Sequence, residues 1–262
     1  MVENLEKIKK LYEGKAKILY ESSDPNYLIQ HFKDDLTAGN GEKKDSFIKK
    51  GIYNQLTSTK IYKYLHGCKV PTHLIKSINT REQVVKKLDI FPVEVVIRNI
   101  AAGSICKRYN LRKGHRFKRP LLELFYKDDS LNDPLINEDA VVEMGLCERY
   151  ELRDIKQQAS IINQRMKEYW DQHHLTLVDA KYEFGIDSSS KIVLGDEITL
   201  DTQRLWCGGL PNLLEHILQR LDTQRLWNRN GESLDKDVFR EGDDMGAVTS
   251  TYNAIYDLIK DS

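Results

Sequence analysis

The sequence reads LTLVDAKYEFGID at residues 175–187 and KIVLGDEIT at residues 191–199, and these two stretches are its most informative feature. In a strand, successive side chains point to opposite faces. The first stretch then carries Asp179, Lys181 and Glu183 on one face and apolar side chains on the other. Turn-forming residues separate the two stretches, so they predict a β-hairpin. The hairpin brings Asp196 within a few residues of Glu183, with the register left open.

Two carboxylates with a lysine between them can hold a divalent cation and the phosphates that this cation neutralises. The alternative is a solvated strand face whose charges pair with one another and bind nothing. The hairpin taken by itself favours neither interpretation. Its neighbours in the sequence are therefore needed to decide between them.

Composition and charge indicate a soluble globular protein. The chain has 262 residues, 40% hydrophobic and 31% charged, which is enough for one large domain or two small lobes. Lys plus Arg and Asp plus Glu both number 40, so bulk charge gives no reason to expect nucleic acid or a membrane as partner. No apolar targeting or membrane-spanning run is found. Four widely spaced cysteines without a CxxC pair predict reduced thiols and a cytoplasmic location.

The remaining segments predict an α+β protein. Strands are expected at 16–20, 27–32, 73–78, 84–90 and 93–100, and helices at 47–65, 105–111, 152–173 and 247–259. Turn formers predict a loop at 34–42, and Phe91-Pro92 is expected to interrupt a strand. We expect a small, mainly antiparallel N-terminal lobe at residues 1–91 and a larger α+β C-terminal lobe at residues 92–262.

The heptapeptide LDTQRLW occurs twice, at residues 200–206 and 221–227. There is no third copy, so the chain is not a repeat protein. The pair indicates a local duplication or an inserted element at about 207–227. Pro211 suits the first turn of a helix, so the second copy is expected at the end of a helix, whereas the first extends from the hairpin.

A glycine and two lysines near the N-terminus suit an anion. Gly14 precedes Lys15 and Lys17, which are two positions apart and are expected on one side of a strand. Two ammonium groups on one face repel unless an anion lies between them, and phosphate is the common solution. The alternative is an exposed basic strand edge.

Two arginines suit a second anion. Arg98 ends a buried strand and needs a partner there. Ser104 is placed to cap the helix that follows, whose N-terminus offers free N–H groups. A structural arginine bonded to carbonyl groups is the alternative. Arg204, eight residues after Asp196, could bind both oxygens of a substrate carboxylate through two nitrogens of its guanidinium group.

Taken together, these segments resemble the SAICAR synthetase family of purine biosynthesis. The matching segments occur in the family's order between residues 11 and 240, and they are LYEGKAKILY, DDLTAGNG, KKLDIFPVEVVIRNIAAGS, LVDAKYEFG, VLGDE, DTQRLW and LDKDVFR. The resemblance implies a two-lobe ATP-binding fold whose N-terminal lobe is similar to those of protein kinases and ATP-grasp enzymes. It also implies a homodimer.

The resemblance further implies an ATP-dependent ligase. ATP activates the carboxylate of carboxyaminoimidazole ribonucleotide (CAIR), as an acyl phosphate, and the amine of L-aspartate then attacks it to form an amide. The products are the succinocarboxamide ribonucleotide SAICAR, ADP and phosphate. Such a reaction needs positioning and charge neutralisation rather than a nucleophilic side chain.

The resemblance assigns residues to three sites. The ATP phosphates are covered by Gly14, Lys15 and Lys17, and the adenine is held by Val85, Leu88 and Ile90. Mg²⁺ is bound by Glu183 and Asp196 beside the ATP phosphates. The ribonucleotide's phosphate and carboxylate are held by Arg98, Ser104, Asp179, Lys181 and Arg204, with Asp179 and Lys181 also catalytic.

Two departures from the family pattern affect these assignments. Asn40 stands where some relatives carry aspartate, which puts an anionic role of its loop in doubt. In the duplicated motif, the copy with Arg204 keeps the family's spacing from GDE, while the copy with Arg225 keeps the continuation into LDKDVFR. We predict that Arg204 is the active-site arginine. The alternative functions are a small-molecule kinase with Asp179 as base and a nucleotide-sensing module without turnover.

Overall fold

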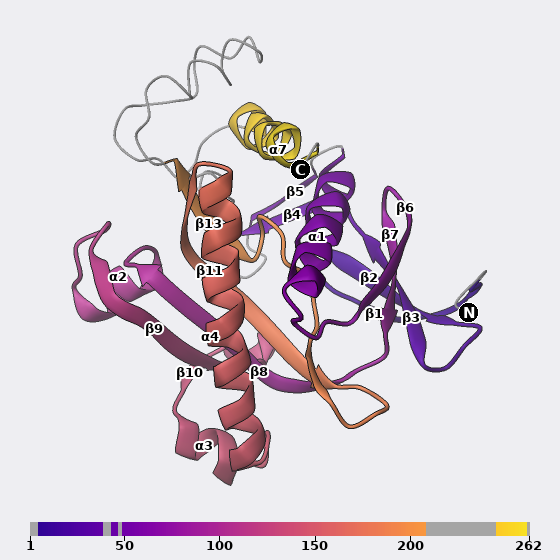
Figure 1. Cartoon of the computed structure of the whole chain (residues 1–262), viewed down its shortest axis with the longest axis horizontal. Coiled ribbons are helices and arrows are strands. Elements are labelled where there is room, and N and C mark those ends of the chain that lie inside the picture. The colour runs from indigo at the N-terminus through magenta and orange to yellow at the C-terminus, as the bar shows by residue number, and fades with distance from the viewer. Residues whose placement is uncertain (1–4, 39–42, 47–48, 208–244, 261–262) are drawn as a thin grey trace.

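Two antiparallel sheets form the frame of the molecule in a computed structural model that describes residues 5–38, 43–46, 49–207 and 245–260 (Figure 1). The first sheet has the order β1-β2-β3-β7-β6. Its strands are β1 (Lys7–Glu13), β2 (Lys17–Ser22), β3 (Tyr27–Phe32), β7 (Glu82–Lys86) and β6 (Leu74–Asn79). A separate two-stranded sheet pairs β4 (Asp35–Ala38) with β5 (Lys43–Ser46).

The second sheet has the order β10-β9-β8-β11-β12, with β13 paired to β11. Its strands are β10 (Leu135–Ile136), β9 (Arg116–Tyr126), β8 (Asp89–Ile100), β11 (Leu175–Ile186), β12 (Ile192–Leu194) and β13 (Gln203–Cys207). The helices are α1 (Lys50–Gly67), α2 (Ser104–Tyr109), α3 (Glu138–Glu143), α4 (Arg149–Gln172) and α7 (Met245–Ile259), and a short 3₁₀ turn spans Asp129–Leu131. The predicted α+β class is confirmed.

The long helix α4 crosses one face of the second sheet (Figure 1). Its apolar stripe recurs every three to four residues, the spacing that keeps one face of a helix against a core. Ile155, Ile162 and Trp170 of this stripe are at most 1% exposed. They share a core cluster with Tyr182 and Phe184 of β11. The apolar face of β11 is therefore turned to the helix, and its charged residues are left for the opposite face.

The structure corrects several predicted boundaries. β8 runs from Asp89 to Ile100 through Phe91-Pro92, because a register shift opposite β11 between Glu183 and Gly185 accommodates the proline without ending the strand. β4 lies inside the predicted loop at 34–42. Strands β1, β9 and β10 and helix α3 were not predicted.

The predicted cap of α2 is also wrong. Gly103, at φ 64°, is the N-cap of this helix, and no side chain caps it. Ser104 lies inside the helix, where its hydroxyl accepts a hydrogen bond from Arg98 instead. The other strands and helices that were expected from the sequence are present, with ends shifted by a few residues.

The division into lobes at residues 1–91 and 92–262 stays a prediction. The element proposed at about 207–227, with the second heptapeptide, lies almost entirely outside the described residues. Among the helices that the structure describes, none is both long and apolar enough to cross a lipid bilayer.

Candidate active site

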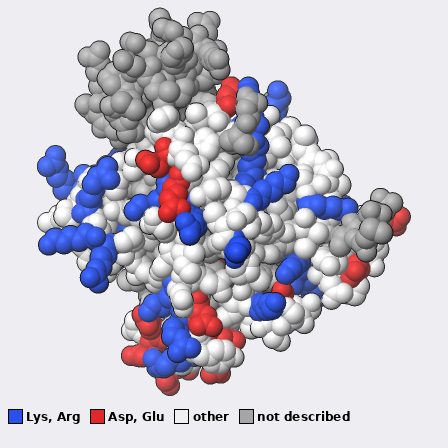
Figure 2. Space-filling view, viewed as in Figure 1, with Lys and Arg blue, Asp and Glu red and all other residues white. Residues whose placement is uncertain are grey.

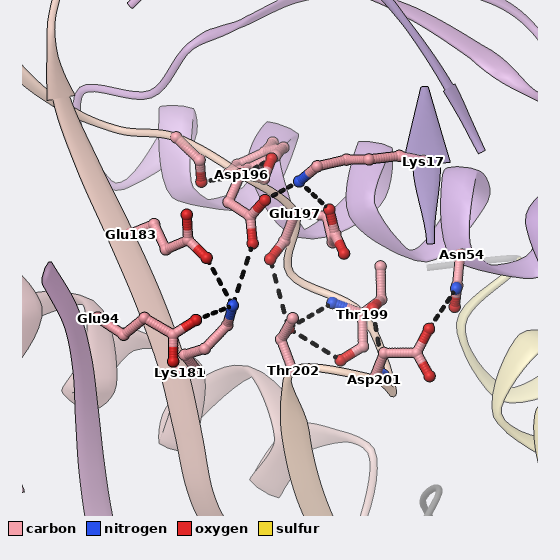
Figure 3. A network of polar contacts seen from close by, with 12 residues as sticks. Lys17, Asn54, Glu94, Lys181, Glu183, Asp196, Glu197, Thr199, Asp201 and Thr202 are labelled. Atoms are coloured by element: carbon pink, nitrogen blue, oxygen red, sulfur yellow. Dashed lines mark hydrogen bonds and ion pairs between the residues drawn. The ribbon is translucent and has the colours of Figure 1, made fainter. Parts of the chain in front are cut away.

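A cluster of carboxylates and lysines lies on the charged face of β11 (Figure 3). Its centre is the Lys181 ammonium, whose Nζ lies 2.8 Å from Glu94 Oε1, 2.5 Å from Glu183 Oε1 and 3.6 Å from Asp196 Oδ2. Lys17 of β2 forms ion pairs with Asp196 and Glu197, and Lys127 forms one with Glu183. We call these seven residues the carboxylate–lysine cluster. The cluster confirms the expected proximity of Asp196 and Glu183.

The hairpin and helix α1 together position Asp196. Phe184 pairs with Leu194, and the Gly195 amide donates to the Glu183 carbonyl at 2.9 Å. Asp196 has a left-handed backbone, φ 59°, a conformation that aspartate tolerates better than most residues. The Tyr62 hydroxyl of α1 donates to the carbonyls of Gly195 (2.8 Å) and Asp196 (3.0 Å), which holds this turn in place.

Helix α1 contacts the same segment a second time. Lys50, the first residue of α1, and Asn54, one turn later, lie 2.5 Å and 2.9 Å from Asp201 Oδ2. The Tyr252 hydroxyl of α7 donates to Asp201 Oδ1 at 2.9 Å. Lys50 is 1% exposed, so Asp201 compensates a buried charge. Residues 195–202 are thus bonded to the backbone of β11 at both ends, and side chains of α1 and α7 hold the segment in between.

The charges in the carboxylate–lysine cluster depend on one another. Burial alone raises the pKa of Glu183, but the ammonium groups of Lys181, Lys127 and Lys17 outweigh burial and hold that pKa well below its usual value. Burial lowers the pKa of Lys181, but Glu183 and Glu94 raise it above its usual value. Both side chains are therefore ionised at neutral pH. An anion or a cation entering here can exchange partners with groups that already carry charge.

A second cluster, the arginine cluster, lies further along β11. Arg204 Nη1 and Arg98 Nη1 both donate to Asp179 Oδ2, at 2.5 Å and 3.1 Å. Arg98 Nε donates to Glu123 Oε2 at 2.6 Å, and Arg98 Nη2 donates to the Ser104 hydroxyl at 3.3 Å. The partners of Arg98 are therefore carboxylates and a hydroxyl, in place of the carbonyl groups of the structural alternative.

Strand pairing builds the arginine cluster. Asp179 of β11 pairs with Arg98 of β8 on one side and with Arg204 of β13 on the other, so the three residues form one row across three strands. All three are less than 9% exposed. A Cβ at Gly103 would lie 2.9 Å from Arg204 Nη2, so glycine leaves the room that this guanidinium occupies.

The structure brings only some of the predicted phosphate-binding residues together. Lys17 belongs to the carboxylate–lysine cluster, whereas Lys15 precedes β2 and pairs at 2.7 Å with the exposed Asp129. The expectation that both lysines share one strand face is therefore wrong. The Gly14 amide donates to the Lys17 carbonyl at 2.9 Å, which closes the turn before β2.

Two of the three predicted adenine-binding residues lie against the hairpin. A Cβ at Gly195 would lie 3.0 Å from Leu88 Cδ1 and 3.2 Å from Ile90 Cδ1, and a Cβ at Gly185 would meet the same two side chains. Leu88 and Ile90 therefore form an apolar surface beside the carboxylate–lysine cluster. Val85 lies in β7 and is 2% exposed.

Several charged residues of the two clusters were missed from the sequence. They are Glu94, Lys127 and Glu197 in the first cluster and Glu123, bonded to Arg98, in the second. Glu94 could have been predicted, because it lies four positions before Arg98 and therefore on the same face of the strand. Lys127 and Glu123 carry no such signal, because β9 itself was not predicted.

The donor chemistry suits magnesium, although no ready-made cage exists. Among the described residues, no group of three or more His, Cys, Asp or Glu side chains is arranged to hold a metal ion. Mg²⁺ prefers oxygen ligands and usually takes one or two carboxylates together with substrate phosphates and water. Glu183 and Asp196, which share Lys181, match that requirement.

Comparisons with known proteins agree with this geometry. The family model for SAICAR synthetase matches residues 10–210. A phosphoribosylaminoimidazole-succinocarboxamide synthase from Fusobacterium nucleatum is 42% identical over 248 residues, which cover 95% of each chain. The Bacillus subtilis protein of the same name is 38% identical over 256 residues, 98% of this chain and 97% of its own.

Solved structures agree as well. The crystal structure of the Ehrlichia chaffeensis synthase superposes with a TM-score of 0.85 at 37% identity, over 96% of this chain and 98% of that one. A SAICAR synthetase in complex with ADP superposes with a TM-score of 0.81 at 38% identity, over 96% and 97%.

Fold, charged clusters and relatives together define the class of protein, an ATP-dependent ligase that forms an amide bond in purine biosynthesis. The chain belongs to the SAICAR synthetase family. Membership confirms the resemblance and the activity expected from the sequence, the ligation of L-aspartate to the carboxylate of CAIR.

Proposed function

We propose that the two clusters on β11 divide the ligase reaction between them. The carboxylate–lysine cluster takes the ATP phosphates, and the arginine cluster takes the anionic groups of CAIR. One observation carries this proposal: Lys181, held at 2.5 Å and 2.8 Å by two glutamates, lies on the same strand face between Asp179 and Glu183. A single lysine there can neutralise both the γ-phosphate and the carboxylate that attacks it.

Lys17 and Lys181 act on the nucleotide side. Each is paired with two or more carboxylates, and an ammonium has three donors, so each lysine can bind a phosphate oxygen while it keeps a carboxylate partner. Gly14 closes the turn over the phosphates, and Lys15 reaches them from the rim. Leu88, Ile90 and Val85 offer the adenine an apolar surface.

Glu183 and Asp196 are the residues that would hold Mg²⁺. The ion, when bound, supplies charge neutralisation at the β- and γ-phosphates. Because Lys181 and Lys17 already lie against these carboxylates, both lysines would shift toward the phosphates as the cation takes their place.

Arg98, Arg204 and Ser104 act on the ribonucleotide side. Arg98 and Arg204 both donate to Oδ2 of Asp179, which places two guanidinium groups side by side, and paired guanidinium groups suit a phosphate or a carboxylate. Asp179 orients both guanidinium groups. Arginine binds such anions with a planar fork, which fixes the ligand's orientation as well as its charge.

The reaction then needs positioning more than a nucleophilic side chain. The CAIR carboxylate oxygen attacks the γ-phosphorus and ADP leaves. The amine of L-aspartate attacks the resulting acyl phosphate, loses its proton and displaces phosphate. Lys181 lies where both negative charges develop, and this kind of electrostatic stabilisation is usually the largest single contribution to catalysis.

The test is an ADP-release assay with ATP, CAIR and L-aspartate, each omitted in turn. We expect sustained ADP release only with all three present. A kinase with Asp179 as base would release ADP without aspartate, and a nucleotide sensor would release none. Lys181→Met should abolish turnover in the complete assay, while Lys167→Met, an exposed lysine on α4, should not.

Two further expectations belong to the same proposal. We expect a homodimer, from the family resemblance, and a cytoplasmic location, from the cysteine usage. Light scattering on the purified protein tests the first expectation. Fractionation of the source cells tests the second.

A further inference from the structure

The charges of this neutral chain are unevenly distributed along the sequence. Residues 95–122 contain eight lysines and arginines and no aspartate or glutamate, although the whole chain has 40 of each kind of charge. Arg98 of the arginine cluster is one of the eight. The other seven lie between residues 107 and 119, and we call them the basic surface: Lys107, Arg108, Arg112, Lys113, Arg116, Lys118 and Arg119.

The basic surface covers α2, the turn after it and the first residues of β9. All seven residues are exposed. In Figure 2, lysine and arginine atoms gather at the left, over the place where Figure 1 shows α2 and the start of β9.

Few acidic side chains compensate this charge. Arg108 pairs with Glu123. In the portion of the chain that the structure describes, no ion pair joins an acidic side chain to any of Lys107, Arg112, Arg116, Lys118 and Arg119. Like charges held close together repel, so such a surface attracts an anion from outside.

Protection of a sheet edge accounts for only part of the surface. β10 pairs with β9 at Leu124 and Phe125, and among the described strands none pairs with that side of the earlier residues of β9. Charged residues and proline on an edge strand prevent pairing with other chains. Lys107 and Arg112 lie outside β9, however, and edge protection does not require one sign of charge throughout.

The basic surface is continuous with the arginine cluster. Glu123 Oε2 accepts from Arg98, while its other oxygen Oε1 is bonded to Arg108 of the surface. Helix α2, which carries Lys107 and Arg108, begins at Ser104, the hydroxyl partner of Arg98. An anion attracted to the surface is thus one helix away from the residues proposed to bind the ribonucleotide.

We propose that the basic surface captures the phosphorylated ribonucleotide and steers it to the arginine cluster. This inference rests on the function proposed for that cluster. A patch of one sign beside a binding site raises the local concentration and the association rate of an oppositely charged ligand, by about 10- to 1000-fold at low salt. The surface itself takes no part in the chemical steps.

The test compares two triple variants with the same change in net charge. Arg112→Gln/Arg116→Gln/Lys118→Gln neutralises the surface. Lys63→Gln/Lys69→Gln/Lys167→Gln neutralises three exposed lysines elsewhere. At low ionic strength we expect the first variant to lose about tenfold in kcat/KM for CAIR through KM, with kcat within twofold. The second should match the parent protein.

The difference should shrink as salt rises, because at 1 M the screening length falls to about 3 Å. Equal kcat/KM for CAIR in the two triple variants at low salt would overturn the proposal. A surface variant that keeps kcat/KM but loses binding to single-stranded RNA would assign the surface to nucleic acid and overturn it as well.

A third variant separates this proposal from the function on which it rests. Arg98→Gln should reduce kcat/KM for CAIR at every salt concentration. If Arg98→Gln has no effect, the proposed ribonucleotide site fails. If Arg98→Gln has an effect and the surface variant has none, only the capture role fails.

Discussion

The two clusters on β11 are built in different ways. The arginine cluster is a row of the sheet, in which Arg98, Asp179 and Arg204 face one another across three paired strands. The carboxylate–lysine cluster takes Asp196 and Glu197 from a segment outside any strand, which side chains of α1 and α7 hold.

The clusters also differ in chemistry. Arginine carries a rigid fork with five donors, whereas lysine carries a compact charge on a flexible stem. A ribonucleotide that must be oriented for attack suits rigid forks on a sheet. ATP, which in our proposal binds with Mg²⁺, gives up its γ-phosphoryl group and leaves as ADP, suits lysines that can change partners. The difference indicates that the arginine cluster is the fixed half of the site and the carboxylate–lysine cluster is its adjustable half.

The largest expected effect comes from Asp196 in the adjustable half. Asp196→Asn keeps the left-handed backbone, which asparagine also tolerates, but removes the charge. We expect kcat to fall by about 10³-fold, the scale for losing one transition-state stabiliser. The apparent KM for Mg²⁺ should rise as well, measured by ADP release across a magnesium titration.

A matched control fixes the interpretation of that loss. Asp171→Asn changes an exposed aspartate at the end of α4. It should retain full activity. If Asp196→Asn keeps both its kcat and its magnesium dependence, the metal assignment is wrong.

Arg204 tests the fixed half. Arg204→Gln removes one of the two guanidinium groups that bind Asp179, and we expect kcat/KM for CAIR to fall by about 10²-fold, since losing a partner of a buried charge pair costs about 2–5 kcal/mol. Arg225→Gln, in the second copy of LDTQRLW, should change kcat/KM little. Loss of activity in the Arg225 variant alone would reverse the choice between the two copies.

The sequence predicted those parts of the two clusters that depend on contacts between residues close together in the chain. Alternation along β11 predicted that Asp179, Lys181 and Glu183 share a face, and the hairpin predicted the proximity of Asp196. Both are local patterns. The row that joins Asp179 to Arg98 and Arg204 depends on strand pairing between distant segments, which no local pattern fixes.

The other features that the sequence did not predict also depend on contacts between distant segments. Strand β9 starts with Arg116, Lys118 and Arg119 and contains Pro120, so it lacks the apolar alternation of a half-buried strand. Helix α1 buries Lys50 and Asn54, which no amphipathic pattern would place inward. Only their distant partner, Asp201, explains their burial.

A substitution of Lys50 tests whether α1 holds the segment that carries Asp196 and Glu197 in the adjustable half. Lys50→Met removes the buried Lys50 ammonium from the Asp201 carboxylate, and we expect a loss of about 3 kcal/mol in the free energy of unfolding. Urea denaturation measures this loss. Because Asn54 and Tyr252 still bind Asp201, the protein should fold. The KM for ATP should rise more than the KM for CAIR.

An equal change in both KM values would show that α1 does not act on the carboxylate–lysine cluster selectively. The matched control is Lys63→Met, an exposed lysine on the same helix. It should leave the unfolding free energy and both KM values unchanged.

His73 should make the unfolding free energy of the protein depend on pH. Burial, followed by the charge of Lys17, lowers the pKa of His73 from its usual value of 6.5 to about 3. The folded protein therefore keeps His73 neutral while the unfolded chain takes up a proton below pH 6.5. The unfolding free energy should fall as the pH drops from 6.5 toward 3, at most about 1.4 kcal/mol per pH unit from this residue.

His73→Gln should flatten the decline between pH 6.5 and 4.5, measured by urea denaturation at each pH. Glu183 contributes in the same direction only below its unfolded value of 4.5, because its pKa is lowered in the fold. An unchanged slope between pH 6.5 and 4.5 would show that His73 is protonated in the folded protein.

The smallest effect is expected from deleting residues 207–227, which removes the second LDTQRLW and joins Trp206 directly to Asn228. Arg204 and the pairing of β13 up to Thr176 with Trp206 remain in the chain. Lengthening a surface loop costs little entropy, about 0.6 kcal/mol per doubling, so its removal should change the unfolding free energy by less than about 1 kcal/mol. If Arg204 is the working copy, kcat/KM for CAIR should stay within twofold. A folded but inactive deletion variant would mean that the fixed half of the site depends on the second copy after all.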